Sequence, residues 1–393
     1  MTTNNTKRKI LIFSTAYYPF VGGAEVAIKE ITDLLAEDFQ FDLITARFNR
    51  KLPKVEKNGT VTVYRIGFGR PKLDKLFLPF FGALKAKKLQ RENGYECFWG
   101  MMASFGSGAG YVYNIFRKIS GKKKIPMVLT LQEGDSENHL KYKWAGLINL
   151  SWKMALKRTD ILTGISNFLL RRAEMMGYEG KKVLIPNGVH VDMFSQIFSD
   201  EEKQKIKNEL GKNEGDIFLV TSSRLTRKNA VDDIISALRF LPVNFSFIVI
   251  GKGEEGQALQ KQAKDLGVSN RVKFLGFVSQ EEIPKYFSAC DIFVRPSRSE
   301  GFGNSFIEAM ASRLPVIATP VGGIVDFVDD HETGVFCAPD NPKSLAEAVD
   351  LLVDDKALKE HIIHNAFDRV STRYSWKHIA REMKEKVFDI FAK

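Results

Sequence analysis

The feature that most constrains the fold is a repeated order of a short apolar segment, a turn of small residues and an amphipathic segment. It begins with an apolar run at 10–15, a turn at 21–23 and helical periodicity over 24–37. Further strands are predicted at 41–45, 61–66, 126–131, 161–164 and 183–185. Strands that alternate with helices predict a parallel sheet with helices on both faces.

The same order restarts in the second half of the 393-residue chain. Strands are predicted there at 217–222, 245–250, 272–275, 292–295 and 315–318. We therefore expect an α/β protein with two Rossmann-like, doubly wound domains, which bind ligands at the carboxyl ends of their strands. The polar, weakly patterned stretch near 194–213 is the expected linker, which places the domains at 1–195 and 196–375.

The two halves differ in charge. Residues 1–190 carry 31 Lys and Arg and 16 Asp and Glu, a net charge of +15, whereas residues 191–393 carry 27 and 31, a net charge of −4. A basic first domain attracts anionic partners, such as a phospholipid surface, a phosphorylated acceptor or nucleic acid. The last of these is not expected, because no nucleic-acid-binding motif accompanies the charge.

Cysteine content and the amino-terminal residues indicate a cytoplasmic protein. The three cysteines show no Cys-x-x-Cys spacing, which argues against a disulfide scaffold or a zinc site. The first apolar run is too short for a signal peptide. Residues 97–116 carry no charge, but their glycines, serines and asparagine make them too polar to span a bilayer. Peripheral association with the inner face of the membrane remains compatible with the basic first domain.

A glycine motif at Gly251, Gly253 and Gly256 follows an apolar strand and resembles a dinucleotide fingerprint. Glu254 and Glu255 would repel a pyrophosphate, and no acidic residue lies in the strand at 272–275 to bind a ribose. A tight turn between strand and helix is therefore favoured over binding of a nicotinamide or flavin cofactor.

The largest group of candidate functional residues follows the strand that ends at Arg295. A glycine-containing loop leads to a helix that begins around Asn304, and the amides of such a helix start favour a diphosphate. Glu300 precedes this helix and Glu308 lies inside it. Two carboxylates beside a phosphate site bind the vicinal hydroxyls of ribose and hexose, so the pattern indicates a nucleotide sugar. The alternative is a helix cap with ordinary surface acids.

These residues resemble a known family. Glu300 and Glu308, separated by seven residues, with Gly-Phe-Gly between them and Glu-Ala-Met-Ala at the second, are similar to the signature of retaining glycosyltransferases of family 4, whose fold is GT-B. Other motifs follow in the family's order at 17–25, 185–194, 223–228, 250–253, 274–278 and 320–323. Residues 376–393 resemble the family's last helix, which packs back onto the first domain.

The resemblance implies four catalytic residues. Arg224 and Lys228 would stabilise the departing diphosphate, although their spacing is narrower than usual in the family and Asn229 stands in place of a glycine, which leaves Arg227 as an alternative. Glu300 would bind the transferred sugar. Gln132 stands where many members have a histidine against that sugar, and Glu133 or Asp135 are alternatives for this role.

The resemblance also implies a donor-binding set. Backbone at Val278 would contact the base and Glu308 the ribose, amides from Gly303 to Phe306 would hold the distal phosphate, and a glycine loop would approach the diphosphate. The set comprises Gly22, Gly23, Val278, Phe302, Gly303, Asn304, Ser305, Phe306 and Glu308. No metal or cofactor is expected, because the chain has no Asp-x-Asp and its six histidines are scattered.

The expected activity is retaining transfer of a hexosyl group from a UDP- or GDP-hexose to a sugar, glycolipid or phospholipid acceptor, in cell-envelope polysaccharide or glycolipid biosynthesis. A sugar-nucleotide epimerase of the same fold is an alternative. Hydrolysis is another, and by double displacement it would need a carboxylate beneath the anomeric carbon. A third alternative, from a different class, is a basic nucleic-acid-binding protein, which the basic clusters of the first half would suit.

Overall fold

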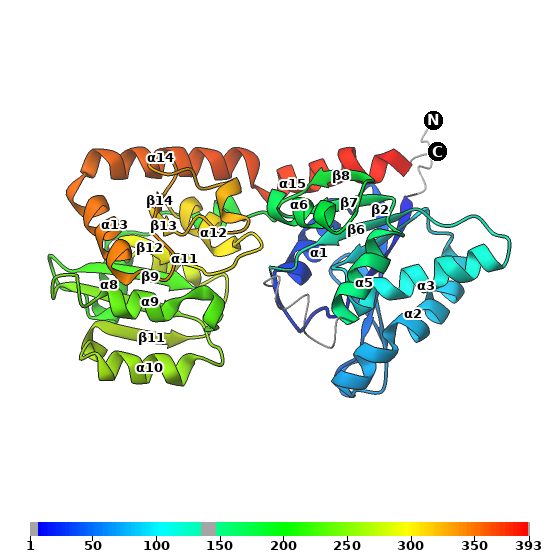
Figure 1. Ribbon diagram of the computed structural model, residues 1–393, viewed down its shortest axis with the longest axis horizontal. Coiled ribbons are helices and arrows are strands. Elements are labelled where there is room, and N and C mark those ends of the chain that lie inside the picture. Colours follow the sequence, from blue (N-terminus) through cyan, green and yellow to red (C-terminus); the bar gives the residue numbers. More distant parts are fainter. Residues whose placement is uncertain (1–6, 135–146, 392–393) are drawn as a thin grey trace. The chain divides into compact units, whose positions relative to one another are not determined.

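The computed structural model describes residues 7–134 and 147–391, which form two compact units. The first unit contains Met1–Asn187 and Trp376–Lys393, and the second contains Gly188–Ser375 (Figure 1). The change of unit lies earlier than the expected boundary at 195. The amide of Val189 donates to the carbonyl of Tyr374 at 2.7 Å, and the ring of Phe194 lies 6.4 Å from that of Phe287, so both residues belong to the second unit.

The first unit is built on a sheet with the order β3-β4-β2-β1-β5-β6-β7-β8 among the described residues. Neighbouring strands are parallel, except that β3 is antiparallel to β4. The strands are β1 (Arg8–Phe13), β2 (Phe39–Ala46), β3 (Val55–Asn58), β4 (Val61–Ile66), β5 (Cys97–Met101), β6 (Met127–Leu131), β7 (Ile161–Gly164) and β8 (Lys181–Leu184).

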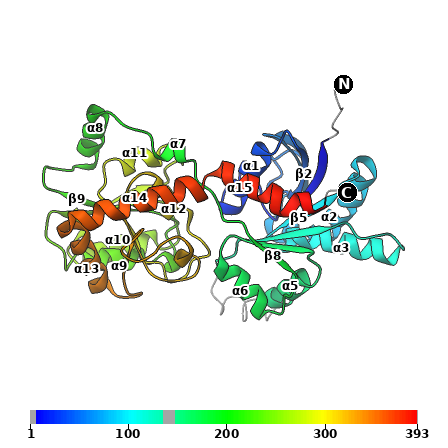
Figure 2. The ribbon, with the colours of Figure 1, turned by 90° about the horizontal axis from the view of Figure 1, so that it is seen from above.

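Helices cover both faces of this sheet (Figures 1 and 2). They are α1 (Gly23–Leu34), α2 (Pro71–Asn93), α3 (Phe105–Ile119), α5 (Leu147–Leu156), α6 (Asn167–Met175) and α15 (Trp376–Met383). The uncharged stretch at 97–116 is divided between β5 and α3. Among the described residues, no helix has the length and apolar character that crossing a bilayer requires.

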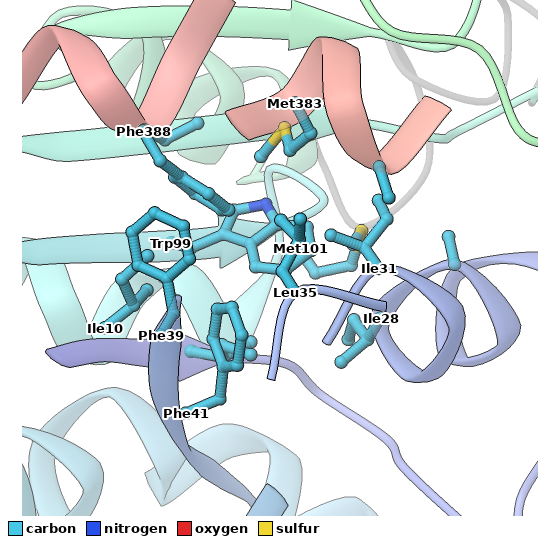
Figure 3. Packing of buried hydrophobic residues seen from close by; sticks show 14 of the residues in the cluster. Ile10, Ile28, Ile31, Leu35, Phe39, Phe41, Trp99, Met101, Met383 and Phe388 are labelled. Carbon is cyan, nitrogen blue, oxygen red and sulfur yellow. The ribbon is translucent and has the colours of Figure 1, made fainter. Parts of the chain in front are cut away.

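The carboxyl-terminal segment contributes to the core of the first unit. The ring of Phe388 lies 5.5 Å from Trp99 and 5.4 Å from Phe39 (Figure 3). Met383 and Phe388 are both almost completely buried. Burial of one such side chain contributes about 1.5–3 kcal/mol, so the first unit depends on residues from the end of the chain.

The second unit has a parallel sheet with the order β11-β10-β9-β12-β13-β14 among the described residues. Its strands are β9 (Ile217–Ser222), β10 (Phe245–Ile250), β11 (Val272–Gly276), β12 (Ile292–Arg295), β13 (Val316–Ala318) and β14 (Val335–Phe336). Its helices are α7 (Val191–Phe194), α8 (Asp200–Leu210), α9 (Val231–Ala237), α10 (Gly256–Asp265), α11 (Ile283–Phe287), α12 (Asn304–Ala311), α13 (Pro342–Asp354) and α14 (Lys356–Arg373).

The stretch predicted to be a linker contains a helix instead. The hydroxyl of Ser199 accepts from the amide of Glu202 at 3.2 Å, and the carboxylate of Glu202 accepts from the amide of Ser199 at 2.8 Å. This capping box starts α8, which buries Ile206 and Leu210. The high charge of the segment belongs to the exposed face of the helix.

Candidate active site

The loop after β12 leads into α12, the helix that carries the expected signature. Gly303 precedes the helix with φ of 100°, a conformation that favours glycine. The apolar side chains Phe306, Ile307 and Met310 are buried and fix the helix to the unit. Its first turn contains no acidic residue. The amide end of α12 therefore keeps its positive character, which suits an anionic ligand.

Arg295, at the end of β12, is the centre of a buried polar network. Its side chain is 8% exposed. The guanidinium pairs with the carboxylate of Glu300 and donates to the hydroxyls of Ser305 at 2.7 Å and Ser297 at 3.2 Å. It also donates to the side-chain carbonyl of Asn229 at 3.1 Å. The sequence pattern predicts Arg295 only as the end of a strand, although a cation that ends an apolar strand five positions before an acid could have indicated the network.

Asn229 connects this network to the loop that carries the expected cations. Its side-chain amide donates to the carbonyl of Arg224 at 2.6 Å. The carbonyl of Lys228 accepts from the amide of Arg298 at 2.8 Å. The structure thus brings the Arg224–Lys228 loop and Glu300 together. Asn229, which stands in place of the family's glycine, is 3% exposed and joins the two loops.

Arg224 is exposed and Lys228 is half-buried. Within 7–134 and 147–391, neither side chain has an acidic partner. Their charges are therefore available to a ligand of the second unit.

The glycine motif at 320–323 holds the backbone of Glu300. A Cβ at Gly322 would lie 1.9 Å from the carbonyl oxygen of Glu300, and the φ of Gly322 is 59°. The amide of Gly323 donates to the same oxygen at 3.1 Å. Any side chain at Gly322 would displace the loop, so this motif fixes the position of Glu300.

Glu308 lies in α12 after its first turn, with 8% of its surface exposed. The side chain of Gln280 donates to its carboxylate at 3.2 Å. Burial raises the pKa of Glu308 to about 7, against the opposing effects of the Gln280 hydrogen bond and of electrostatic interactions with Arg295 and His190. Val278 lies two positions before Gln280 on the same loop, so the hydrogen bond holds that loop beside α12.

Two aromatic residues of the expected donor-binding set belong to the core. Phe302 is 1% exposed, and its ring lies 5.1 Å from Phe327 and 5.8 Å from Tyr374. The ring of Phe306 packs 5.4 Å from Phe293, and its amide donates to the carbonyl of Gly303 at 3.0 Å. Their apolar side chains are more stable in the core than at a polar site, so a donor would meet Asn304 and Ser305 at the helix start instead.

Gln132 follows β6 in the first unit and forms a reciprocal amide pair. Its side-chain nitrogen donates to Asn187 at 3.0 Å, and the Asn187 nitrogen donates back at 3.3 Å. The carboxylate of Glu133 accepts from the backbone amides of Ala103 at 2.6 Å and Gln132 at 3.0 Å, so it supports the loop. Asp135 lies outside the described residues.

Gly22 and Gly23 lie at the start of α1. A Cβ at Gly22 would lie 2.9 Å from a carboxylate oxygen of Glu25. Burial raises the pKa of Glu25, while hydrogen bonds from the amides of Glu25 and Gly22 oppose the shift. The amide end of α1 is therefore already occupied by a carboxylate of the chain.

The glycines at 251–253 are explained by packing against a neighbouring loop. A Cβ at Gly251 would lie 1.9 Å from the carbonyl of Ser223, and one at Gly253 would lie 2.1 Å from the carbonyl of Leu225. The amide of Leu225 donates to the carbonyl of Lys252 at 3.1 Å. These contacts support the loop that carries Arg224 and account for the glycines without a dinucleotide.

Two parallel-sheet units, with this glycine-helix site in the second, define a glycosyltransferase of the GT-B fold. The family model Glycosyltransferase Family 4 matches residues 21–193, and the family model Glycosyl transferases group 1 matches residues 202–369. The chain belongs to glycosyltransferase family 4 and is a transferase enzyme.

Similar proteins agree with this assignment. An uncharacterized glycosyltransferase of Methanocaldococcus jannaschii is 32% identical over 52% of this chain and 53% of its own length, so the match spans about half of that relative. Sucrose-phosphate synthase from Thermosynechococcus elongatus has the same fold, with a TM-score of 0.82, 21% identity and coverage of 98% of this chain and 100% of the other. Anabaena HepE, solved in complex with UDP-glucose, gives a TM-score of 0.77 at 22% identity over 97% and 99%.

Proposed function

We propose that this chain is a retaining hexosyltransferase that uses a UDP- or GDP-hexose as its donor. The observation that carries the proposal is the pair of buried carboxylates around the start of α12, Glu300 held by Arg295 and Glu308 held by Gln280. Glu300 would accept hydrogen bonds from hydroxyls of the hexose, and Glu308 would accept them from hydroxyls of the ribose. The amides at Asn304 and Ser305 would face the diphosphate between them.

Arg224 and Lys228 would stabilise the charge that develops on the departing diphosphate. In the proposed step the bond between the anomeric carbon and the diphosphate oxygen breaks. The acceptor oxygen bonds to the same face of that carbon, and the acceptor proton passes to the departing phosphate. Two cations on one loop supply the charge that a metal would otherwise supply, so transfer is expected to proceed in EDTA.

The acceptor is proposed to be a sugar, glycolipid or phospholipid, with the lipid-linked classes favoured by the net charge of +15 over residues 1–190. Such an acceptor would place the protein at the inner face of a membrane. No nucleic-acid partner is proposed.

Thermal shift measurements with UDP, GDP, ADP, their hexose conjugates and NAD test the donor site. A ligand that binds only the folded state stabilises it by about 2.7 kcal/mol at 100 times its Kd. UDP-glucose is the first donor to test, because a structure of the same fold was solved with it. We expect one nucleoside diphosphate and its hexose conjugate to raise the midpoint.

The matched variants are Glu308→Ala and Glu347→Ala, since the side chain of Glu347 is 66% exposed on α13 of the same unit. Only Glu308→Ala should abolish the shift. A response to NAD alone would refute the proposal. Proton NMR of the transferred sugar then reads the anomeric configuration, and inversion would contradict a retaining mechanism.

A further inference from the structure

Helix α2 carries an apolar stripe on its exposed face. Its members are spaced three and four residues apart, are each between 40% and 60% exposed, and comprise Leu73, Leu76, Phe77, Phe80, Phe81 and Leu84. This spacing places them on one side of a helix. Isolated exposed apolar residues are ordinary in soluble proteins, but a continuous stripe of six marks an interaction surface.

The stripe is not needed for folding, because α2 buries a different face. Leu78, Ala83, Ala86 and Leu89 are almost completely buried. A Cβ at Gly82 would lie 2.7 Å from the Cβ of Ala109, which shows how closely α2 packs against α3 on this side. The two helices lie side by side in both ribbon views (Figures 1 and 2). α2 is thus apolar on two faces, and the fold of the first unit uses one.

The start of α2 is held rigidly. The buried carboxylate of Asp74 accepts from the backbone amides of Phe68 at 2.7 Å, Gly69 at 2.8 Å and Arg70 at 2.9 Å. The helix therefore presents its stripe without having to order itself first, which lowers the entropic cost of binding.

Many cations accompany the stripe on α2 and at the end of α3. Residues 70–93 contain seven Lys and Arg and two Asp and Glu, and one of those acids is the buried Asp74. Residues 117–124, at the end of α3, contain five cations and no acid. A surface that combines exposed apolar side chains with many cations matches the layered chemistry of an anionic bilayer.

A groove of about 570 Å³ joins the two helices beside the stripe. Its walls combine the apolar Leu84, Phe116 and Ile119 with basic side chains that include Lys87 and Arg91. Ile119 is 78% exposed at the rim.

A second hollow of about 540 Å³ also borders α3. It shares Lys122 with the groove and adds the cations Lys118, Lys124, Lys157 and Arg158. Lys124 is paired with Asp160, whereas the other cations of the hollow form no ion pair with an acid in the part of the chain that the structure describes. Both hollows therefore favour anionic headgroups.

We propose that the α2 stripe, defined as the six residues from Leu73 to Leu84 named above, docks the first unit on an anionic phospholipid bilayer. Its phenylalanines and leucines enter the interface, and Lys87, Arg91 and the 117–124 cations contact lipid phosphates. A second copy of the chain is a poorer occupant, because a symmetric contact would bring the cations of both copies together. The inference rests on the membrane-held acceptor of the proposed function, but vesicle binding itself needs no donor.

Co-sedimentation with vesicles of phosphatidylcholine, with and without about one third phosphatidylglycerol, tests the docking. The whole chain should sediment with the anionic vesicles and remain in the supernatant with the neutral ones. The stripe variant Phe77→Ser/Phe80→Ser/Leu84→Ser should lower the partition coefficient at least about tenfold. Its matched control is Phe240→Ser/Val243→Ser, which changes apolar residues that are 53% and 87% exposed in the second unit and should bind like the wild type.

A double charge-reversal variant tests the contribution of the lipid phosphates separately from that of the apolar contacts. Each Lys or Arg near an anionic surface contributes about 1 kcal/mol, so Lys87→Glu/Arg91→Glu should also weaken binding at least tenfold. Lys343→Glu, at a side chain that is 72% exposed in the second unit, should not. Circular dichroism and the thermal midpoint check that each variant is folded.

Three results would overturn the docking proposal. The wild type could remain in the supernatant with anionic vesicles, or the stripe variant could sediment like the wild type. Light scattering could also show that the wild type is a dimer and the stripe variant is not. The nucleotide thermal shift is measured on the same samples. A stripe variant that keeps this thermal shift but no longer binds anionic vesicles supports docking. Vesicle binding without any thermal shift from a nucleotide would refute the proposed donor site but not the docking proposal.

Discussion

Two helices begin after glycines, one in each unit, and they differ in what meets their amide ends. In the first unit, α1 carries Glu25 in its first turn, and this carboxylate accepts from amides at the helix start. In the second unit, α12 carries no acid in its first turn. Its nearest carboxylate, that of Glu300, is turned into an ion pair with Arg295.

The difference shows how a similar local pattern acquires two uses. Amides at a helix start attract negative charge wherever they occur. When the chain supplies the charge itself, as at α1, the helix start is stabilised and closed to a ligand. When a buried arginine forms an ion pair with the neighbouring acid, as at α12, the helix start stays available for a diphosphate.

The largest expected effect comes from removing that arginine. Arg295→Met leaves the buried Glu300 without its partner, and breaking a buried pair in this way costs about 3–5 kcal/mol of unfolding free energy. Sugar transfer should fall at least about a hundredfold, because Glu300 and the Arg224 loop lose their common anchor. Denaturant unfolding and steady-state kinetics measure the two effects.

The matched control is Arg298→Ala. Arg298 also pairs with acids, among them Asp232 at 2.8 Å and Asp233 at 2.9 Å, but its side chain is 21% exposed and lies outside the Arg295 network. The loss of stability should be clearly smaller than for Arg295→Met. Equal losses from the two variants would show that the Arg295 network has no special role.

The cations of the neighbouring loop should change the rate with little effect on stability. Removing one group that stabilises developing charge lowers kcat by about 10²–10³. Lys228→Ala and Arg224→Ala should each show this loss, and the free energy of unfolding should stay within about 0.5 kcal/mol. Arg227→Ala is the comparison variant, and a larger kcat loss there than at Lys228 would transfer the role to Arg227.

Local patterns were enough for much of the fold. The strands at 61–66, 161–164, 217–222, 245–250 and 292–295 lie where the apolar runs predict them. β5 was missed because Cys97–Met101 merges into an uncharged stretch without a turn signal. The antiparallel β3 was missed because it has only four residues and three of them are polar. α8 was missed because only its cap, not its sparse apolar face, marks it.

The Glu308 carboxyl provides a pH-dependent test of the second unit. Its pKa rises from an ordinary 4.5 to about 7 through burial, so ionisation is unfavourable in the folded state as the pH increases between these values. Glu308→Gln should therefore be more stable than the wild type at pH 8, by roughly 1–3 kcal/mol, and nearly equal to it at pH 5. Denaturant unfolding at both values measures this.

Glu308→Gln should also weaken nucleotide binding at pH 8, since a neutral amide accepts ribose hydroxyls less strongly than a carboxylate. A stability difference that is the same at pH 5 and pH 8 would mean that Glu308 does not titrate in this range.

The smallest effect is expected at the closed helix start of the first unit. Glu25→Gln should change the free energy of unfolding by no more than about 1 kcal/mol, because the attraction to the helix amides and the cost of burial oppose each other. The thermal shift caused by a nucleoside diphosphate should remain. Loss of that shift would contradict the contrast between α1 and α12.

The candidate site could be predicted from the sequence where its motif is local, but not where its network joins residues that are distant in the chain. Glu300, Glu308 and the start of α12 follow from one contiguous segment. The hydrogen bond between Asn229 and Arg295 joins residues 66 positions apart, and the sequence around Asn229 contains no motif that predicts it. The core position of Phe302 was likewise hidden, because its partners Phe327 and Tyr374 are distant in the chain.

The return of the chain to the first unit has a consequence for the order of folding during synthesis. The second unit occupies Gly188–Ser375 without interruption, and its two ends meet where Val189 pairs with Ser375. The core of the first unit, in contrast, includes Met383 and Phe388, which follow the whole second unit in the chain. Domains generally fold as units while the chain emerges, so all residues of the second unit leave the ribosome before the first unit has its complete core.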